Sequence, residues 1–313
     1  MPVRRTSKPL TIEEAILYKY DPDADGYTQS LLGSFMCCPL RGMLSAHRWS
    51  NPKKANMTGF GSLVHYVLEH WQMEDDCNIK ECIATYAKKH GSRLGARGTE
   101  DLEFLKTKAQ VVLEAYAERY AKEQSEMRGF VSEGVFEFEG RRGKIDGSFR
   151  DKNRKPWLME TKTMSRVEED NLLLHLSFDF QNLFYMDNFE QSNNVKVHGV
   201  LYNMIRQPQL KLKAGESLKQ YGDRVAADIE SRPDFYFIRM HISYTRRDIQ
   251  RFRDELKFKV ARMRDFTSGT IPVYRNEFAC KAPFPCEFLQ ACASGHMSGY
   301  VQKELLFEEL EAE

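Results

Sequence analysis

The chain has 313 residues, with 46 Lys and Arg residues against 45 Asp and Glu residues, so its formal net charge is +1. A hydrophobic content of 42% allows one large domain or two ordinary ones and excludes global disorder. The near-neutral charge excludes a uniformly basic protein that coats nucleic acid, but it is compatible with one local basic channel. The sequence has no apolar run of about 18 residues, and its N-terminal segment lacks the apolar region of a secretory signal. We therefore expect a cytoplasmic protein without a membrane segment.

The N-terminal part of the chain is predicted to be mostly helical. Residues 1–27 are polar and suggest a leader or docking arm, and residues 28–128 form a predicted helical region. Apolar spacing in this region predicts helices over 29–47, from residue 59 onward, over 79–90 and over 100–127. The first helix must kink or break at Pro39, because proline has no backbone N–H to donate.

At Phe130 the hydrophobic pattern changes from helical to alternating. Three consecutive strands are predicted over 130–140, 142–151 and 156–164, and a helix follows over 168–190. Two further strands over 195–205 and 234–244 and a helix over 245–266 complete a core at 129–268. Residues 269–313 hold three cysteines and an acidic tail. This order of elements predicts an α/β fold with a helical N-terminal elaboration.

The third predicted strand carries a candidate catalytic group. Because side chains alternate along a strand, Glu160 and Lys162 project from one face, and the preceding strand of the hairpin offers Asp146. Two carboxylates and an amine suit Mg²⁺ or Mn²⁺, which prefer oxygen ligands. Such a metal lowers the pKa of a bound water and neutralises charge on a scissile phosphate. A surface hairpin with an ordinary Glu–Lys pair is the alternative interpretation of these residues alone.

Two helices contribute further candidates. His65 lies four residues after Gly61, and the glycine permits a close approach of its helix to another backbone. His65 is a candidate metal ligand, although a core histidine is the simpler interpretation of this residue by itself. Gln181 and Tyr185 lie at positions i and i+4 on one face of a later helix, a spacing that is uninformative in isolation.

Taken in order, these residues resemble the RecB-type branch of the PD-(D/E)XK nuclease superfamily. The chain matches four ordered blocks of that branch: GxxxHxxLE at Gly61–Glu69, GxID at Gly143–Asp146, ExKT at Glu160–Thr163 and QxxxY at Gln181–Tyr185. The resemblance implies a restriction-endonuclease-like core, in which a central mixed sheet is flanked by helices. It also implies a metal-dependent DNA nuclease rather than an inactive relative.

The same resemblance assigns roles to individual residues. It implies that a Mg²⁺ or Mn²⁺ ion is bound by His65, Asp146, Glu160 and the backbone carbonyl of Thr161. Lys162 would orient the attacking water or stabilise the pentacovalent phosphate. Gln181 and Tyr185 would position the DNA or the lysine, and Glu133 on the first strand is a supporting candidate.

The seven cysteines indicate a metal centre rather than a disulfide scaffold. One early cysteine and three late ones resemble the iron–sulfur subset of the superfamily, which includes the AddB nuclease domain, exonuclease V and the CRISPR-adaptation nucleases. The resemblance implies a [4Fe–4S] cluster that staples two terminal segments unable to build a core for themselves. Its ligands would be Cys38, Cys280, Cys286 and Cys292.

Parts of the cysteine assignment stay open. Cys38 is preferred to Cys37 because Pro39 and a basic residue follow it, as in the family. The five-residue interval before Cys286 departs from the family's tighter spacing. Zinc in a four-cysteine site and unligated cysteines are the alternatives to the cluster. Two isolated cysteines, Cys77 and Cys82, are expected to be unligated thiols.

Basic and aromatic residues beside the core are candidates for DNA contacts. The basic ones are Arg141, Arg142, Lys144, Arg150, Lys152, Arg154, Lys155, Arg246, Arg247, Arg251 and Arg253. Such side chains could bind phosphates, whereas Trp157, Phe184 and Tyr202 could stack on bases.

The sequence thus predicts a metal-dependent exonuclease that hydrolyses phosphodiester bonds at DNA ends, preferably single-stranded. Similar nucleases are used in recombination and repair, in phage genomes and in CRISPR adaptation. The chain lacks a G-x-x-x-x-G-K-[ST] motif, so any unwinding would need a helicase partner. A recombinase or a CRISPR-adaptation protein is another candidate partner. The alternatives are a structure-specific endonuclease and a non-catalytic DNA-binding or assembly subunit.

Overall fold

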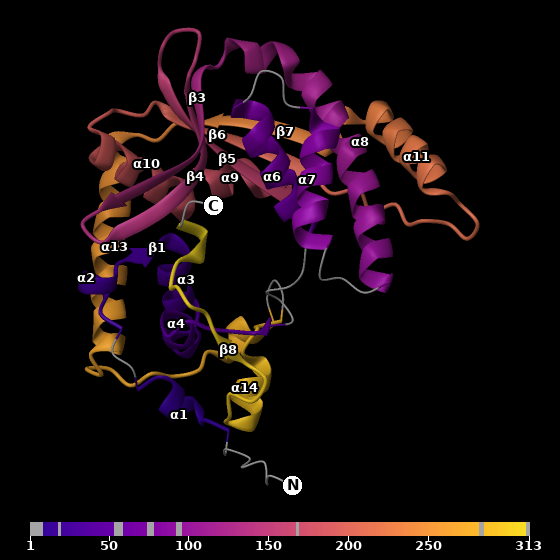
Figure 1. Ribbon diagram of the computed structural model, residues 1–313. Helices are drawn as coiled ribbons and strands as arrows, with labels where there is room; N and C mark the ends of the chain where they lie inside the picture. Colours follow the sequence, from indigo (N-terminus) through magenta and orange to yellow (C-terminus); the bar gives the residue numbers. More distant parts are fainter. Residues whose placement is uncertain are drawn as a thin grey trace, which may run out of the picture. The chain divides into compact units, whose positions relative to one another are not determined.

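The computed structural model of the protein describes residues 9–17, 20–52, 59–73, 78–91, 96–166, 169–281 and 285–310. The chain divides into two compact units, and each unit combines segments that are far apart in the sequence. Unit 1 comprises Met1–Met57, Phe136–Gly143 and Ile249–Glu313, whereas unit 2 comprises Thr58–Val135 and Lys144–Asp248. The colours of Figure 1 follow these segments along the chain.

A central mixed sheet organises unit 2. Its strands follow the order β4 (Arg141–Arg150), β5 (Pro156–Met164), β6 (Gly199–Arg206) and β7 (Phe237–Ile242), and β3 (Arg128–Phe138) pairs with β4. The β5–β6 pair is parallel, whereas the β4–β5 and β6–β7 pairs are antiparallel. This mixed sheet with flanking helices confirms the predicted α/β, restriction-endonuclease-like class.

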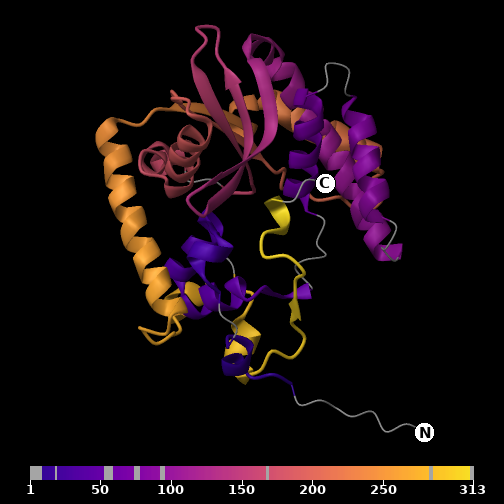
Figure 2. The same cartoon turned by 60° about the vertical axis from the view of Figure 1, so that its left-hand side comes forward.

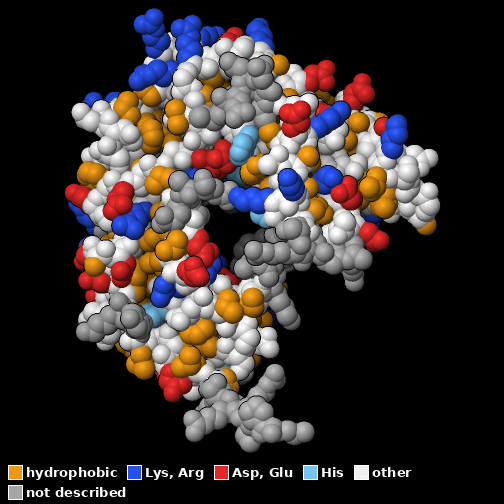
Figure 3. Space-filling model, in the orientation of Figure 1, with side chains coloured by type: hydrophobic (Ala, Val, Ile, Leu, Met, Phe, Trp, Pro, Cys, Tyr) orange, Lys and Arg blue, Asp and Glu red, His pale blue; other side chains and the backbone are white. Residues whose placement is uncertain are grey.

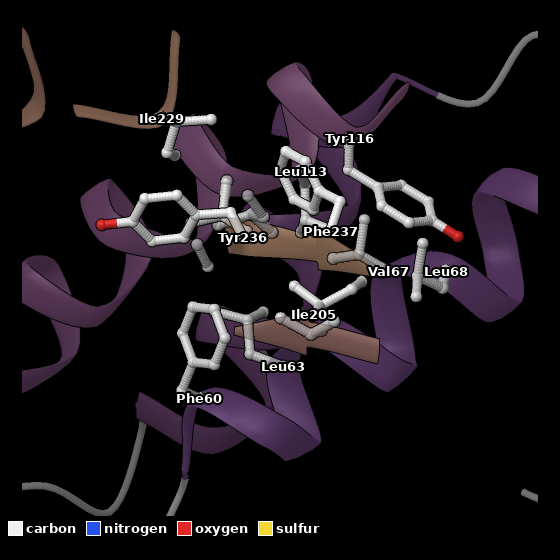
Figure 4. Close-up of a cluster of buried hydrophobic side chains, with 14 of the residues drawn as sticks. Phe60, Leu63, Val67, Leu68, Leu113, Tyr116, Ile205, Ile229, Tyr236 and Phe237 are labelled. Carbon is white, nitrogen blue, oxygen red and sulfur yellow. The ribbon is translucent and has the colours of Figure 1, made fainter. Parts of the chain in front are cut away.

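One group of helices covers a first face of this sheet. It comprises α6 (Phe60–Met73), α7 (Ile79–Gly91), α8 (Ala96–Glu126), α11 (Leu218–Ser231) and the short α12 (Pro233–Tyr236). Both ribbon views show α6, α7 and α8 side by side (Figures 1 and 2). Their apolar side chains form one buried cluster with Ile205 of β6 and Phe237 of β7 (Figure 4). Burial of this cluster supplies the main driving force for folding of unit 2.

The opposite face of the sheet meets a second pair of helices. These are α9 (Glu169–Leu176) and α10 (Phe180–Asn193). Leu176 of α9 packs with Tyr202, Met204 and Ile242 of the sheet. All eight residues of β6 are buried, as expected for a strand covered on both sides. Alternate side chains of β6 therefore pack against different helices: Ile205 faces the first group, whereas Tyr202 and Met204 face α9.

Unit 1 brings N-terminal and C-terminal segments of the chain together. The Met297 N–H donates to the Leu10 carbonyl at 2.8 Å, and β2 (Trp49–Ser50) pairs with β8 (Val301–Gln302). The two segments share a buried apolar cluster of Ile12, Ala15, Cys38, Leu40, Leu44, Phe288, Ala291, Met297 and Tyr300. A buried apolar cluster therefore accompanies the cysteines where these segments meet.

The remaining elements of unit 1 are mostly short. They are α1 (Ile12–Ala15), α2 (Pro22–Asp25), β1 (Tyr27–Thr28), α3 (Gln29–Cys37), α4 (Pro39–Ala46), most of α13 (Arg246–Thr267), the 3₁₀ turn Glu277–Cys280, α14 (Leu289–Ser294) and the 3₁₀ turn Glu308–Leu310. Within the segment expected to be a polar leader, Ile12, Ala15, Tyr20 and Tyr27 are buried. This segment thus contributes to the packing of unit 1.

The predicted elements agree with the structure except at particular boundaries. The three strands of the hairpin region are confirmed, and the predicted interruption at Pro39 is the junction between α3 and α4. The helix predicted over 168–190 is wrong in its continuity, because the chain breaks between α9 and α10. There Asp179 caps α10 by accepting a hydrogen bond from the Asn182 N–H at 2.7 Å.

In the described residues we find no helix long and apolar enough to cross a membrane.

Candidate active site

The candidate site lies in unit 2, where β4 and β5 part. Their pairing extends from Arg150 opposite Pro156 to Gly147 opposite Met159, although β5 continues to Met164. At the next residue, the Asp146 carboxylate accepts a hydrogen bond from the Thr161 N–H at 2.6 Å. The Asp146 side chain thus takes the place of a backbone carbonyl of β4 as the partner of the Thr161 N–H. Asp146 and the end of β5 therefore lie together where the two strands separate.

Glu160 and Lys162 form a compact group with Gln181 of α10. The Lys162 ammonium lies 2.5 Å from Glu160 Oε1 and donates to Gln181 Oε1 at 2.8 Å. The Gln181 amide in turn donates to Glu160 Oε1 at 2.9 Å. Because lysine can only donate, it fixes the orientation of the Gln181 amide. The three side chains therefore hold one another in place.

Burial and charge shape the protonation of this group. Glu160 is only 4% exposed, and burial, with a further contribution from Asp146, raises its pKa to about 7. Burial alone would lower the pKa of Lys162, but the neighbouring Glu160 carboxylate outweighs that effect and raises it. Lys162 is therefore a charged donor beside Glu160, and an additional positive charge nearby would lower the pKa of Glu160.

Helix α6 brings His65 to Asp146. His65 Nδ1 lies 3.5 Å from Asp146 Oδ1. Burial opposes protonation of the imidazole, but the interaction with Asp146 prevails and raises the pKa of His65. Helix α6 approaches β5 closely at Gly61, since a Cβ there would lie 2.7 Å from Thr163 Oγ1. The neighbour is a side chain rather than the backbone that we expected.

The other two predicted residues relate less directly to the site. Tyr185 lies one helical turn after Gln181, and its ring packs edge-on against Phe184 at 6.3 Å between centroids. Glu133 has a positive φ of 53° and forms an ion pair with Lys144 of β4. Their roles in the site stay predictions.

The donor types at the candidate site suit a divalent metal ion. Two carboxylates, an imidazole and a backbone carbonyl are suitable ligands for Mg²⁺ or Mn²⁺. Across the described ranges, no three or more His, Cys, Asp or Glu side chains are grouped so that they could hold a metal ion. Asp146 and His65 form one pair, while Glu160 contacts Lys162 and Gln181.

The predicted cluster cysteines lie near one another in unit 1. Cys38 Sγ accepts a hydrogen bond from the Asn276 N–H at 3.4 Å, and the Cys280 thiol donates to the Asn276 carbonyl at 3.7 Å. The Cys286 N–H donates to the Cys280 carbonyl at 3.0 Å. Burial raises the pKa of Cys292, and the nearby charges of the other three cysteines raise it further. Four thiols thus share one region, although in the part of the chain that the structure describes they are not grouped closely enough to hold a metal ion.

Three sequence-based expectations are wrong. Trp157, Phe184 and Tyr202 are 6%, 0% and 7% exposed, so these rings belong to the core and do not offer a face to DNA bases. Cys82 is not a free thiol but is disulfide-bonded, and Cys77 lies outside the described residues. Arg141 is buried and donates to the Phe138 carbonyl, so its guanidinium is engaged within the protein.

The tip of the β4–β5 hairpin agrees better with a phosphate-binding surface. Figure 3 shows Lys and Arg side chains gathered at this tip. The exposed basic residues there are Arg150, Lys152, Arg154 and Lys155. The Asp151 carboxylate shapes the turn by accepting hydrogen bonds from the Asn153 and Lys155 N–H groups. Their contact with DNA stays a prediction.

Sequence reasoning missed a group of buried polar residues behind the site. Asn203 donates to Thr161 Oγ1 at 3.1 Å and accepts a hydrogen bond from Arg239 at 3.1 Å. An asparagine inside the otherwise apolar run VLYNMI and an arginine inside YFIRMHI were the available signals. Buried polar side chains in strand interiors are uncommon and require partners.

Comparison with known proteins identifies the family. Residues 27–293 match the model described as the PD-(D/E)XK nuclease superfamily. The chain belongs to this superfamily. Nucleases of this superfamily typically use Mg²⁺ or Mn²⁺.

Solved structures support the fold. A crystal structure from Eubacterium rectale described as a "Putative exonuclease" has a TM-score of 0.51 and 14% sequence identity. The match covers 98% of this chain and 99% of that one. At this identity the likeness shows the fold alone. The comparison with curated proteins gave no match.

Proposed function

We propose that this chain is a Mg²⁺- or Mn²⁺-dependent deoxyribonuclease of the RecB-type branch that degrades DNA from its ends, preferably single-stranded ones. One observation carries the proposal. Residues from four separate elements, His65 of α6, Asp146 of β4, the β5 residues Glu160 and Lys162, and Gln181 of α10, make direct contacts in two adjoining groups. The Asp146–Thr161 hydrogen bond links these groups through β5.

The roles of the residues follow from their chemistry. His65, Asp146, Glu160 and the Thr161 carbonyl would hold the cation. When bound, such a cation lowers the pKa of a coordinated water and offsets the charge of the phosphate. Lys162, held between Glu160 and Gln181, presents a fixed positive charge to the phosphate oxygens. Tyr185 would position the DNA or the lysine.

The biological setting is also part of the proposal. We assign catalysis to the nuclease core at 129–268 together with His65 of the helical region at 28–128. The chain would act in the cytoplasm on DNA ends in a recombination, repair, phage or CRISPR-adaptation context. A helicase, a recombinase or a CRISPR-adaptation protein would supply the single-stranded end.

The preference for ends can be tested on matched substrates. Linear and covalently circular single-stranded DNA of the same sequence would be incubated with the full-length protein and Mg²⁺, Mn²⁺ or EDTA. We expect loss of the linear DNA only and only with metal. Cutting of the circle would favour the endonuclease alternative. Metal-independent binding without any cleavage would favour the non-catalytic DNA-binding alternative.

A second part of the proposal concerns the four cysteines. Cys38, Cys280, Cys286 and Cys292 would hold a [4Fe–4S] cluster in unit 1, a cofactor that is bound by four thiolates. Their shared contacts through Asn276 and their mutual electrostatic influence support this assignment. Metal analysis of protein prepared without oxygen tests it. Four irons per chain would agree with the cluster, whereas one zinc would favour the alternative.

A further inference from the structure

A row of three polar side chains crosses the sheet of unit 2 next to the candidate site. Thr161 of β5 lies opposite Asn203 of β6, and Asn203 lies opposite Arg239 of β7. Residues directly opposite each other project from the same face of a sheet. The row occupies the face covered by α8, because Arg239 contacts Tyr116 and Tyr120 of that helix.

Hydrogen bonds connect the row from end to end. Arg239 Nε donates to Asn203 Oδ1 at 3.1 Å, and Asn203 Nδ2 donates to Thr161 Oγ1 at 3.1 Å. Since an arginine can only donate, it fixes which end of the Asn203 amide faces Thr161. The hydrogen bonds therefore all run from Arg239 through Asn203 to Thr161, whose hydroxyl oxygen is the final acceptor.

Helix α8 anchors the far end of the row. The Arg239 guanidinium donates to the Tyr116 hydroxyl at 2.5 Å and lies 3.7 Å from the centroid of the Tyr120 ring. Its Nη1 lies 2.9 Å from the Glu123 carboxylate. The Arg239 side chain is only 5% exposed. A planar guanidinium held on several sides has little freedom to move.

Burying three polar side chains in the interior of a sheet is unfavourable for folding, which indicates a role beyond stability. Asn203 is 0% exposed and Thr161 is 4% exposed, so both polar groups have lost their hydration. The next row on the same face is Thr163, Ile205 and Phe237, of which the last two belong to the apolar cluster. Replacing a buried polar row with apolar residues is often neutral or stabilising.

The near end of the row is attached to the site. The Thr161 N–H binds the Asp146 carboxylate at 2.6 Å, and its carbonyl is a ligand in the proposed function. We propose that Asn203 and Arg239 are positioning residues that hold the Thr161 peptide, and through it Asp146, in the geometry that binds the catalytic cation. This inference rests on the proposed function for the identity of the ligands. Residues that orient metal ligands commonly contribute 10- to 100-fold to metal affinity or activity.

The first test compares Thr161→Val with Thr161→Ser. Valine has nearly the same shape but cannot accept the bond from Asn203, whereas serine keeps the hydroxyl. Binding of Mn²⁺ to the full-length protein would be measured by electron paramagnetic resonance, without DNA. We expect Thr161→Val to weaken Mn²⁺ binding by about 10- to 100-fold and Thr161→Ser to restore most of it. In cleavage assays, kcat should fall while KM for DNA changes little.

The second test separates positioning from stability. A variant carrying Thr161→Val, Asn203→Leu, Arg239→Met, Tyr116→Phe and Glu123→Gln makes the row apolar and leaves neither the Tyr116 hydroxyl nor an unpaired Glu123 carboxylate behind. We expect an unchanged or raised melting temperature together with weak Mn²⁺ binding and low kcat. The control is Asn188→Ala, since Asn188 is also 0% exposed and donates one hydrogen bond, to the Phe184 carbonyl. It should lower the melting temperature without changing Mn²⁺ affinity.

The outcomes distinguish this inference from the proposed function. Wild-type Mn²⁺ affinity in Thr161→Val and in the apolar-row variant would overturn the positioning role, whatever the activity. A wild-type protein that binds Mn²⁺ but cuts no DNA would overturn the proposed function, and the Mn²⁺ affinities of the variants would still decide the positioning role. A wild-type protein that binds no Mn²⁺ would overturn both.

Discussion

The two units of the molecule use different means to hold distant segments together. Unit 2 packs long helices on a mixed sheet around one large apolar cluster, and its candidate catalytic residues project from regular strands and helices. Unit 1 joins short elements from both ends of the chain around a smaller cluster that includes Cys38 and contacts Cys286 and Cys292. Apolar burial therefore suffices to explain the fold of unit 2. In unit 1, where the apolar cluster is smaller, we expect the cysteines to contribute to stability as well.

This comparison leads to separable expectations. Changes in the polar groups of unit 2 should affect activity more than folding, because the apolar cluster persists without them. Changes in the cysteines of unit 1 should affect folding more than chemistry, because no cysteine belongs to the candidate catalytic group. The following predictions run from the largest expected effect to the smallest.

Lys162→Met should have the largest effect. It removes the ammonium that lies between Glu160 and Gln181, and loss of one such electrostatic group typically lowers kcat by roughly 10²–10³-fold. It also leaves Glu160 buried without its cation, which costs about 1–3 kcal/mol of the free energy of unfolding. Adding Glu160→Gln should recover that stability but not the activity. Chemical denaturation and single-turnover cleavage measure both effects, and an unfolded double variant would show that Lys162 has a broader structural role.

Cys286→Ser should distinguish a ligated thiol from a buried one. If Cys286 holds a cluster, the variant should lose its iron, and its melting temperature should fall by roughly 10 °C. We expect unit 1 to remain partly folded, since its apolar cluster persists. Cys37→Ser is the matched control, because Cys37 is adjacent in sequence to Cys38 but is not one of the proposed cluster ligands. A Cys286→Ser protein with wild-type iron content and stability would contradict the assignment.

Gly61→Ala should disturb the contact between α6 and β5. The added Cβ would lie 2.7 Å from Thr163 Oγ1, and overpacking of this kind typically costs about 1–3 kcal/mol. Because His65 is on the same helix, we also expect a several-fold loss of activity. Removing the Thr163 hydroxyl with Thr163→Ala should relieve both effects in the double variant. Gly59→Ala is the control for loss of glycine alone, since no described atom beyond its chain neighbours would lie within 4 Å of the added Cβ.

Charge reversal at the hairpin tip should have the smallest effect. Lys152→Glu combined with Arg154→Glu should weaken DNA binding several-fold and reduce the slope of log affinity against log salt by about 2. Folding and kcat should not change, since both side chains are exposed. The control is Lys88→Glu combined with Lys122→Glu, which also reverses two positive charges, at exposed positions of α7 and α8. Equal effects of the two double variants would indicate a general electrostatic response rather than a DNA contact.

Local periodicity predicted most of the regular elements, whereas the residues of the candidate site were assigned by the resemblance to the family. Alternation along β5 was enough to place Glu160 and Lys162 on one face, and the order of the four motifs supplied Gln181 and His65. Asp179 should have indicated the break between α9 and α10, since aspartate is a favoured helix cap.

The remaining features depend on pairing between distant strands. The row of Thr161, Asn203 and Arg239 exists only because β5, β6 and β7 adopt one particular register. No local pattern specifies that register, so their proximity could not be predicted. The stacking role expected for Tyr202 failed for a related reason, because both faces of β6 are covered by helices. A strand's own sequence does not reveal how many of its faces are covered.

The most direct test of the catalytic assignment is a single-turnover assay with wild-type protein and Lys162→Met on single-stranded DNA labelled at one end. Both proteins would be assayed at equal, saturating concentration with Mg²⁺ and with EDTA, after circular dichroism has shown that both are folded. We predict release of label by the wild-type protein with Mg²⁺ only, and a rate roughly 10²–10³-fold lower for Lys162→Met. Equal rates for the two folded proteins would contradict the account, because cleavage would then not depend on the site described.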